Sequence, residues 1–152
     1  MRRFWKLALL LAIAAQLAAY SACLREKFLS TKGEALTLWQ FRGKKLVVTF
    51  WATWCPWCKK ELSELKILKK RFGDDINIIA FSVDRDREAL YRFIRERGSE
   101  FPFILAISTP RIRYCFGGIR GIPATFILDE KLTIVQRFIG FVSIDRLERE
   151  LD

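Results

Sequence analysis

The sequence contains no histidine, and only four of its 152 residues are cysteine. Without histidine, the chain's own side chains cannot form a Ser-His or Cys-His catalytic pair, a His-ligated metal site or the attachment site of a c-type haem. Zinc is also disfavoured, because Cys23 and Cys115 stand alone, outside any second Cys-x-x-Cys. Chemistry must therefore rest on cysteine, carboxylate or lysine side chains, and we expect no metal and no bound cofactor.

Internal repeats and low-complexity stretches are missing as well. The length, with 51% hydrophobic and 14% aromatic residues, fits one globular domain plus a short appendage. The net charge is +10, but both signs are mixed along most of the chain. We therefore interpret the excess of lysine and arginine as a solvated basic surface, and we do not expect nucleic acid as a partner.

The N-terminus combines early positive charge with an apolar run. Three basic residues lie within residues 2–6, and the following stretch, 7–22, is apolar apart from Gln16. This pattern is typical of an export signal. We therefore expect residues 24–152 on the extracytoplasmic side of a bacterial inner membrane, in the periplasm or its equivalent, where disulfide chemistry is possible.

Three interpretations of this segment stay open. It is an uncleaved membrane anchor, a signal cleaved after Ser21, or a lipoprotein signal with lipid attached to Cys23. We favour the anchor. The chain accordingly divides into a signal or anchor segment (1–23), a polar linker (24–35) and a folded domain (36–152).

Apolar periodicity in the rest of the chain predicts alternating strands and helices. Turn residues, caps and stretches too apolar to face water set the approximate boundaries. The expected elements are a strand at 36–39, a strand within 43–52, a helix from Pro56 to Phe72, a strand at 76–83, a helix from Asp84 and Asp86 to Gly98, a strand at 101–106, a short helix at 109–116, a hairpin of 124–129 and 133–140, and a last helix capped by Ser143. This order predicts an α/β fold with a central mixed sheet covered by helices on both faces.

The most specific feature is WATWCPWCKK at residues 51–60. Pro56 suits the first turn of a helix, which places Cys55 at the helix N-terminus, where backbone N–H groups and the helix dipole stabilise a thiolate. Cys58, one turn further on, can close a reversible disulfide with Cys55. A permanently closed structural bridge is a weaker alternative, since a four-residue loop constrains little chain entropy. Cys115 we interpret as an inert buried thiol.

The tryptophans around this motif divide into two groups. We expect Trp51, within the buried strand, to pack in the core. Trp54 and Trp57 lie next to the thiols, and we expect them to form an apolar rim on which an extended partner chain docks.

Three segments carry a family resemblance. The first is FWATWCPWCKKEL, preceded by GKKLVV; the second is FSVDRDREALYRFIRERGSEFPF; the third is GIRGIPATFILD. Together they resemble the active-site strand and helix, the inserted strand and helix, and the cis-proline segment of the TlpA-like (ResA/DsbE-like) thiol-disulfide oxidoreductases of the thioredoxin superfamily. The resemblance covers residues 33–152 and implies a thioredoxin-like three-layer sandwich behind the N-terminal hydrophobic segment.

The resemblance also implies roles for particular residues. Cys55 is the nucleophile, Cys58 the resolving thiol, and the Ile122–Pro123 bond is cis, which leaves the backbone of Ile122 free to pair with an extended substrate. The residues expected to contact substrate are Trp54, Pro56, Trp57, Ile122 and Pro123.

The implied function is that of an exported, membrane-tethered disulfide reductant. Its expected partners are disulfide-bearing exported proteins, apocytochrome c among them, and a membrane electron donor of the DsbD/CcdA type. Alternatives are a periplasmic disulfide oxidase, a thiol peroxidase and a redox-inert binding or chaperone-like module. The peroxidase is motivated by the Cys-Pro pair, but Ala52 stands where its usual threonine would be.

The sequence departs from the family pattern at three positions. Thr49 stands where thioredoxins carry a buried aspartate, so the proton acceptor for Cys58 is open between water, Asp84 and Glu26. Leu132 stands where the family hairpin often has glycine, which leaves the turn type open. The third departure is tryptophan at position 57, which replaces the small residue or proline more usual before the second cysteine.

Overall fold

The computed structural model describes the backbone of residues 2–152 and the side-chain environments of residues 4–152. The predicted α/β alternation is confirmed. The elements in chain order are α1 (Arg2–Leu24), β1 (Lys27–Leu29), β2 (Ala35–Thr37), η1 (Leu38–Phe41), β3 (Lys45–Trp51), α2 (Pro56–Phe72), η2 (Gly73–Asp75), β4 (Ile76–Ser82), α3 (Arg87–Arg97), η3 (Gly98–Glu100), β5 (Ile104–Ile107), α4 (Pro110–Cys115), β6 (Ala124–Leu128), β7 (Ile134–Ile139) and α5 (Ile144–Leu151).

A five-stranded mixed sheet organises the domain in the order β5-β4-β3-β6-β7. Strands β3, β4 and β5 run parallel, whereas β6 and β7 are antiparallel to their neighbours. The central strand β3 pairs with β4 through Val47↔Ile78 and with β6 through Thr49↔Thr125. Because every residue of β3 after Lys45 is buried, the redox motif that follows it starts from a rigid part of the fold.

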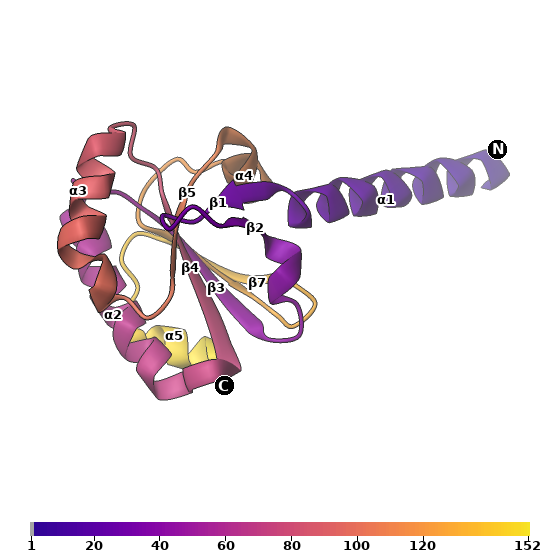
Figure 1. The fold of residues 1–152 in the computed structure, drawn as a ribbon. Coiled ribbons are helices and arrows are strands. Elements are labelled where there is room, and N and C mark those ends of the chain that lie inside the picture. The colour runs from indigo at the N-terminus through magenta and orange to yellow at the C-terminus, as the bar shows by residue number, and fades with distance from the viewer. Residues whose placement is uncertain (1) are drawn as a thin grey trace.

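Apolar clusters on the two faces of the sheet form two cores. One contains residues of α2, α3 and α5, including Leu65, Leu90 and Leu147. The other contains residues of α4, η1, β1 and the end of α1. Figure 1 shows α2, α3 and α5 on one side of the sheet and α1 and α4 on the other. The expected three-layer, thioredoxin-like arrangement is therefore confirmed.

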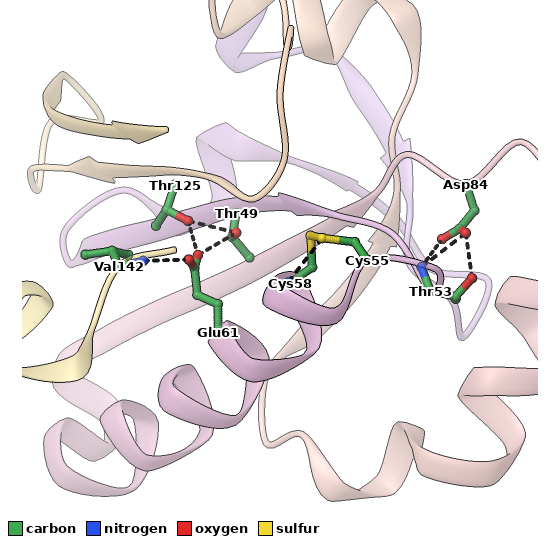
Figure 2. Close-up of a disulfide and its surroundings, with 8 residues drawn as sticks. All are labelled: Thr49, Thr53, Cys55, Cys58, Glu61, Asp84, Thr125 and Val142. Carbon is green, nitrogen blue, oxygen red and sulfur yellow. Dashed lines mark hydrogen bonds between the residues drawn. A yellow bond between two sulfur atoms is a disulfide. The ribbon is translucent and has the colours of Figure 1, made fainter. Parts of the chain in front are cut away.

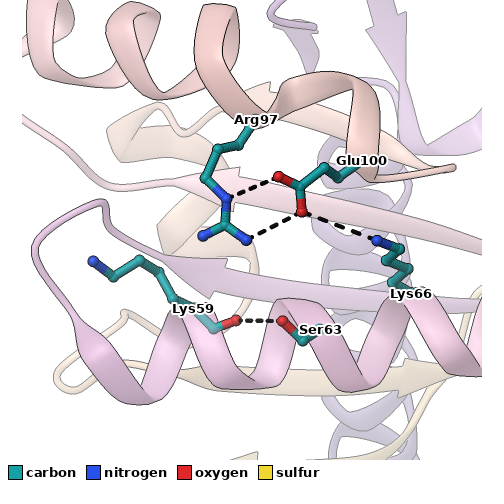
Figure 3. A network of polar contacts seen from close by, with 5 residues as sticks. All are labelled: Lys59, Ser63, Lys66, Arg97 and Glu100. Atoms are coloured by element: carbon teal, nitrogen blue, oxygen red, sulfur yellow. Dashed lines mark hydrogen bonds and ion pairs between the residues drawn. The ribbon is translucent and has the colours of Figure 1, made fainter.

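Ionic contacts link helix α3 and its 3-10 extension η3 to α2. Arg97 donates from Nε and Nη2 to the two carboxylate oxygens of Glu100 at 3.0 and 3.1 Å, and Lys66 of α2 lies 4.0 Å from the same carboxylate (Figure 3). The hydrogen bonds from Arg97 lower the pKa of Glu100. Because these contacts are exposed, they add little stability.

The N-terminal helix α1 is apolar and exposed except at its end. Its segment Phe4–Leu24 has a mean hydropathy of 2.0 and is long and apolar enough to cross a membrane. At its C-terminal end Leu24 is buried in the second core, and the hydroxyl of Tyr20 donates to the carbonyl of Leu132. The helix therefore meets the domain through packed and hydrogen-bonded contacts.

The interpretation of Cys115 as an inert buried thiol is wrong. Cys115, at the end of α4, is half-buried and forms a disulfide with Cys23 in the last turn of α1. The two residues are 92 positions apart, so only the packing of α1 against α4 brings them together. An ion pair of 3.2 Å between Arg111 and Glu26 lies at the same junction.

Residues 24–35, predicted to be a polar linker, contain β1, which pairs with β2 in a two-stranded antiparallel sheet. Phe28 is buried and packs edge-on against Phe81 of β4. A further bridge joins Ser30 to Ala106 of β5. This segment is therefore part of the folded structure, and the domain boundary at residue 36 stays a prediction.

Two of the predicted strands have different bounds in the structure. The strand expected at 36–39 gives way after Thr37 to the 3-10 turn η1, because Leu38 turns into the second core and the Gln40 side chain accepts a hydrogen bond from the Thr37 N–H. The strand expected at 101–106 begins only at Ile104, since η3 and Pro102 occupy the preceding positions.

Leu132, where the family often has glycine, adopts a positive φ of 68°. A left-handed conformation costs a non-glycine residue about 1–2 kcal/mol. The side chain of Leu132 is fully buried, which contributes roughly 1.5–3 kcal/mol. Packing thus offsets the strain of the turn.

Candidate redox-active site

Cys55 and Cys58 form a disulfide at the N-terminus of α2. Cys55 is the N-cap residue, Pro56 occupies the first helical position, and the Cys58 N–H donates to the Cys55 sulfur at 3.2 Å. The predicted placement of Cys55 is therefore confirmed. Both residues are buried, and Cys55, at 7% exposed, is nearer the surface than Cys58, at 1%. Figure 2 shows the pair between the end of β3 and the first turn of α2.

Asp84 holds the loop that carries Cys55. Its carboxylate accepts hydrogen bonds from the N–H of Thr53 at 3.1 and 3.2 Å and from the Thr53 hydroxyl at 2.7 Å. The hydroxyl of Ser82 donates to it at 2.7 Å. Asp84 is thus occupied in positioning the β3–α2 loop (Figure 2). The other candidate proton acceptor, Glu26, is paired with Arg111 at the α1 junction.

The acidic side chain near Cys58 that the sequence interpretation missed is Glu61. It lies on α2 three residues after Cys58 and is 1% exposed. The hydroxyls of Thr49 and Thr125 hydrogen-bond to its Oε1 atom, and the Val142 N–H donates to Oε2 at 3.0 Å. Figure 2 shows this network beside the disulfide.

Burial raises the pKa of Glu61, and the charge of nearby Glu64 raises it further, while the hydrogen bonds oppose both effects. A carboxyl group of this kind exchanges a proton near neutral pH more readily than an exposed one. Helical spacing offered a signal for it: Glu61 falls on the same face as Cys58, Leu65 and Leu68, where a charge is unexpected.

The tryptophans divide as expected in their exposure. Trp51 is buried in the first core, whereas Trp54 is 69% and Trp57 is 58% exposed. The Trp57 ring lies 5.6 Å from that of Phe141, and the Lys60 ammonium lies over both rings. An apolar surface with cationic edges therefore borders the disulfide, and its use as a docking rim stays a prediction.

The Ile122–Pro123 peptide bond is cis, as predicted. Ile122 packs against the core that contains both cysteines of the pair. Within the described residues, Ile122 makes no backbone hydrogen bond, whereas the following Ala124 already belongs to β6. Its peptide groups are therefore available to a partner, and the substrate contacts of Ile122, Pro123 and Pro56 stay predictions.

Within the part of the chain that the structure describes, no three acidic or cysteine side chains are placed to hold a metal ion.

Comparisons with known proteins agree with this geometry. The Redoxin family profile matches residues 19–151. The thioredoxin-like protein YneN of Bacillus subtilis is 28% identical over 123 residues, which is 79% of this chain and 71% of that protein. The thiol-disulfide oxidoreductase ResA of Bacillus anthracis is 28% identical over 118 residues, 77% of this chain and 67% of that protein.

Solved structures share the fold. StoA from Bacillus subtilis superposes with a TM-score of 0.69 at 23% identity, covering 86% of this chain and 99% of its own. A thiol:disulfide interchange protein from Chlorobium tepidum gives 0.73 at 22% identity, covering 83% and 90% respectively.

Proposed function

This chain belongs to the Redoxin family, and on that premise we propose that it is a thiol-disulfide oxidoreductase whose Cys55–Cys58 pair reduces disulfides in exported proteins. The observation that carries the proposal is the Cys55–Cys58 disulfide, with the first cysteine as the cap of α2. Relatives named thiol-disulfide oxidoreductase support it.

The reaction transfers two electrons from the Cys55/Cys58 dithiol to the partner's disulfide and proceeds through one mixed disulfide. In the dithiol state the Cys55 thiolate attacks a sulfur of the partner's disulfide, which breaks that bond and releases one partner thiolate. Cys58 then loses its proton and attacks the Cys55 sulfur, which releases the second partner thiolate. The protein is left with the Cys55–Cys58 disulfide, and the partner is reduced to a dithiol.

The proton from Cys58 needs an acceptor away from bulk water, because this residue is buried. Glu61 meets that requirement: it lies one helical turn from Cys58, and its pKa is raised by burial. Thr49, Thr125 and Val142 hold its carboxylate in place. Glu61 thus takes the part that the buried aspartate plays in thioredoxins.

The reductant direction is supported by the apolar helix α1, which is long and apolar enough to hold the domain at a membrane that carries an electron donor. A membrane electron donor of the DsbD/CcdA type would restore the dithiol. Tethering both proteins to one membrane raises their effective concentration.

We further propose that α1 is retained as an anchor, with the domain on the extracytoplasmic face. The disulfide between Cys23 and Cys115 occupies the sulfur that lipid attachment would need. The contacts of Leu24 and Tyr20 with the domain also support a helix that stays with it. Disulfides persist in extracytoplasmic compartments and rarely in the cytosol.

Rapid acid quenching and alkylation of intact cells test the function and its direction. We expect Cys55 and Cys58 to be mostly in the dithiol form, and loss of the membrane donor to convert them to the disulfide. A mostly oxidised pair, with secreted proteins short of disulfides when this protein is deleted, would instead identify an oxidase. Consumption of hydrogen peroxide at a rate exceeding that of disulfide exchange would identify a peroxidase.

A further inference from the structure

A groove beside the redox pair carries an excess of positive charge. It has a volume of about 1110 Å³, and its walls come from the loop before α2, the start of α3, α4 and the loop before β6. The charged side chains that line it are four arginines and two aspartates: Arg85, Arg87, Arg113, Arg120, Asp84 and Asp86.

Both aspartates are already engaged. Asp84 accepts hydrogen bonds from Thr53 and Ser82, and Asp86 accepts from the N–H groups of Glu88 and Ala89 as the cap of α3. None of the four arginines forms a salt bridge with any residue that the structure describes. Arg113 donates one hydrogen bond to the Ser108 hydroxyl at 3.3 Å, which leaves its other N–H groups free of carboxylate partners among the described residues. The guanidinium groups can therefore bind carboxylates from outside, which arginine holds in a bidentate manner.

The groove is continuous with the site of disulfide exchange. Trp54, immediately before Cys55, and Ile122, immediately before Pro123, both line it. A partner whose disulfide reaches Cys55 would lay the residues that flank this disulfide along the groove. The charge of those flanking residues then decides how well the partner fits.

We propose that the groove selects substrates in which acidic residues flank the reactive disulfide, with the four arginines binding Asp and Glu side chains. This inference rests on the proposed function, since it names the substrate class of the Cys55–Cys58 pair. Complementary charge raises the association rate and favours the right partner, whereas like charge rejects the wrong one.

Binding is measured first, separately from redox chemistry. The full chain, in a neutral detergent, is titrated with short fluorescent peptides in which serine replaces both cysteines and the flanking residues are glutamate, glutamine or lysine. We expect the glutamate peptide to bind about tenfold more tightly than the lysine peptide at low salt, with the preference shrinking as salt increases.

Two double variants with equal loss of charge locate the effect. Arg85→Gln/Arg120→Gln removes two groove arginines, and Arg95→Gln/Arg149→Gln removes two exposed arginines of α3 and α5 that do not line the groove. In the groove variant we expect the ratio of affinities for the glutamate and lysine peptides to fall at least about fivefold. In the control variant this ratio should stay within about twofold of the wild-type value.

Cystine-containing forms of the same peptides test the consequence for exchange. The reduced protein should react fastest with the glutamate form and slowest with the lysine form. A protein that reduces none of the peptides, yet keeps the binding preference, would reject the proposed function and with it the substrate class, while the groove's preference for acidic chains would hold.

Equal binding of the three peptides, or an equal loss in the two double variants, overturns the inference. Anionic lipid is the competing source of negative charge. We expect the preference to persist when the chain is held in nanodiscs of phosphatidylglycerol. If it disappears there but persists in phosphatidylcholine discs, the arginines bind lipid headgroups and the substrate proposal is wrong.

Discussion

The hydroxyl of Thr49 lies 3.1 Å from the Oε1 atom of Glu61 and donates a hydrogen bond to it. The position where thioredoxins carry a buried aspartate on the central strand is thus occupied by a donor to a buried carboxylate on α2. The buried acidic side chain beside the redox pair therefore comes from helix α2 (Figure 2).

The first prediction concerns Glu61→Gln. Glutamine keeps the size of the side chain but cannot accept the Cys58 proton, so we expect the rate of disulfide exchange to fall at least about tenfold. The pH profile should also lose the limb that belongs to Glu61. The measurement is stopped-flow reduction of a cystine peptide across pH. Glu64→Gln is the matched control, because Glu64 is also on α2 and accepts from the Ile144 N–H; equal losses in both variants would contradict the role of Glu61.

The second prediction concerns stability and pH. Burial raises the pKa of Glu61 in the folded protein. The contribution of Glu61 to folding stability is therefore fully present below the ordinary carboxyl pKa, and it is lost as pH rises through the raised value. As the pH rises from acid to neutral, the urea midpoint of the wild type should therefore fall relative to that of Glu61→Gln. Glu100→Gln serves as the control of opposite sign, since Arg97 lowers the pKa of Glu100 and its small contribution is lost on acidification. Parallel pH profiles for the two variants would refute the assignment.

The third prediction concerns Cys115→Ser. The disulfide with Cys23 closes a loop across 92 residues. Its loss should lower the free energy of unfolding by about 2–4 kcal/mol, measured by urea denaturation in detergent. The redox midpoint of Cys55–Cys58 should not move, because the junction lies on the other face of the sheet. Peptide mapping of the wild type should recover a Cys23–Cys115 cross-link, whereas a lipid-modified Cys23 would disprove the pairing.

Local patterns were enough to predict most of the fold. The apolar runs that became β3 and β4 could face water on neither side, and Leu62, Leu65 and Leu68 gave α2 its buried face. Pro56 and Gly73 marked the two ends of α2, so the position of Cys55 as its cap followed from the sequence.

Contacts between distant segments could not be predicted in this way. The bond between Cys23 and Cys115 depends on how α1 meets α4, and pairing of β1 with β2 turns an apparent linker into a sheet. Glu61 was overlooked because its partners, Thr125 and Val142, come from β6 and the loop before α5. Helical spacing placed Glu61 on the buried face of α2, but the donors that hold its carboxylate are brought together only by the fold.

The most direct test of the account is a redox titration of the full chain, with the free thiols labelled and mapped at each potential. Cys55 and Cys58 should gain label together as a two-electron couple, with a midpoint near thioredoxin's value of about −270 mV. Cys23 and Cys115 should stay unlabelled at that potential. If Cys55 and Cys58 gain no label at any potential, or if Cys115 takes up label before Cys55, the pair is not the reversible switch proposed for it; a midpoint near the value of about −120 mV for DsbA would contradict the reductant direction.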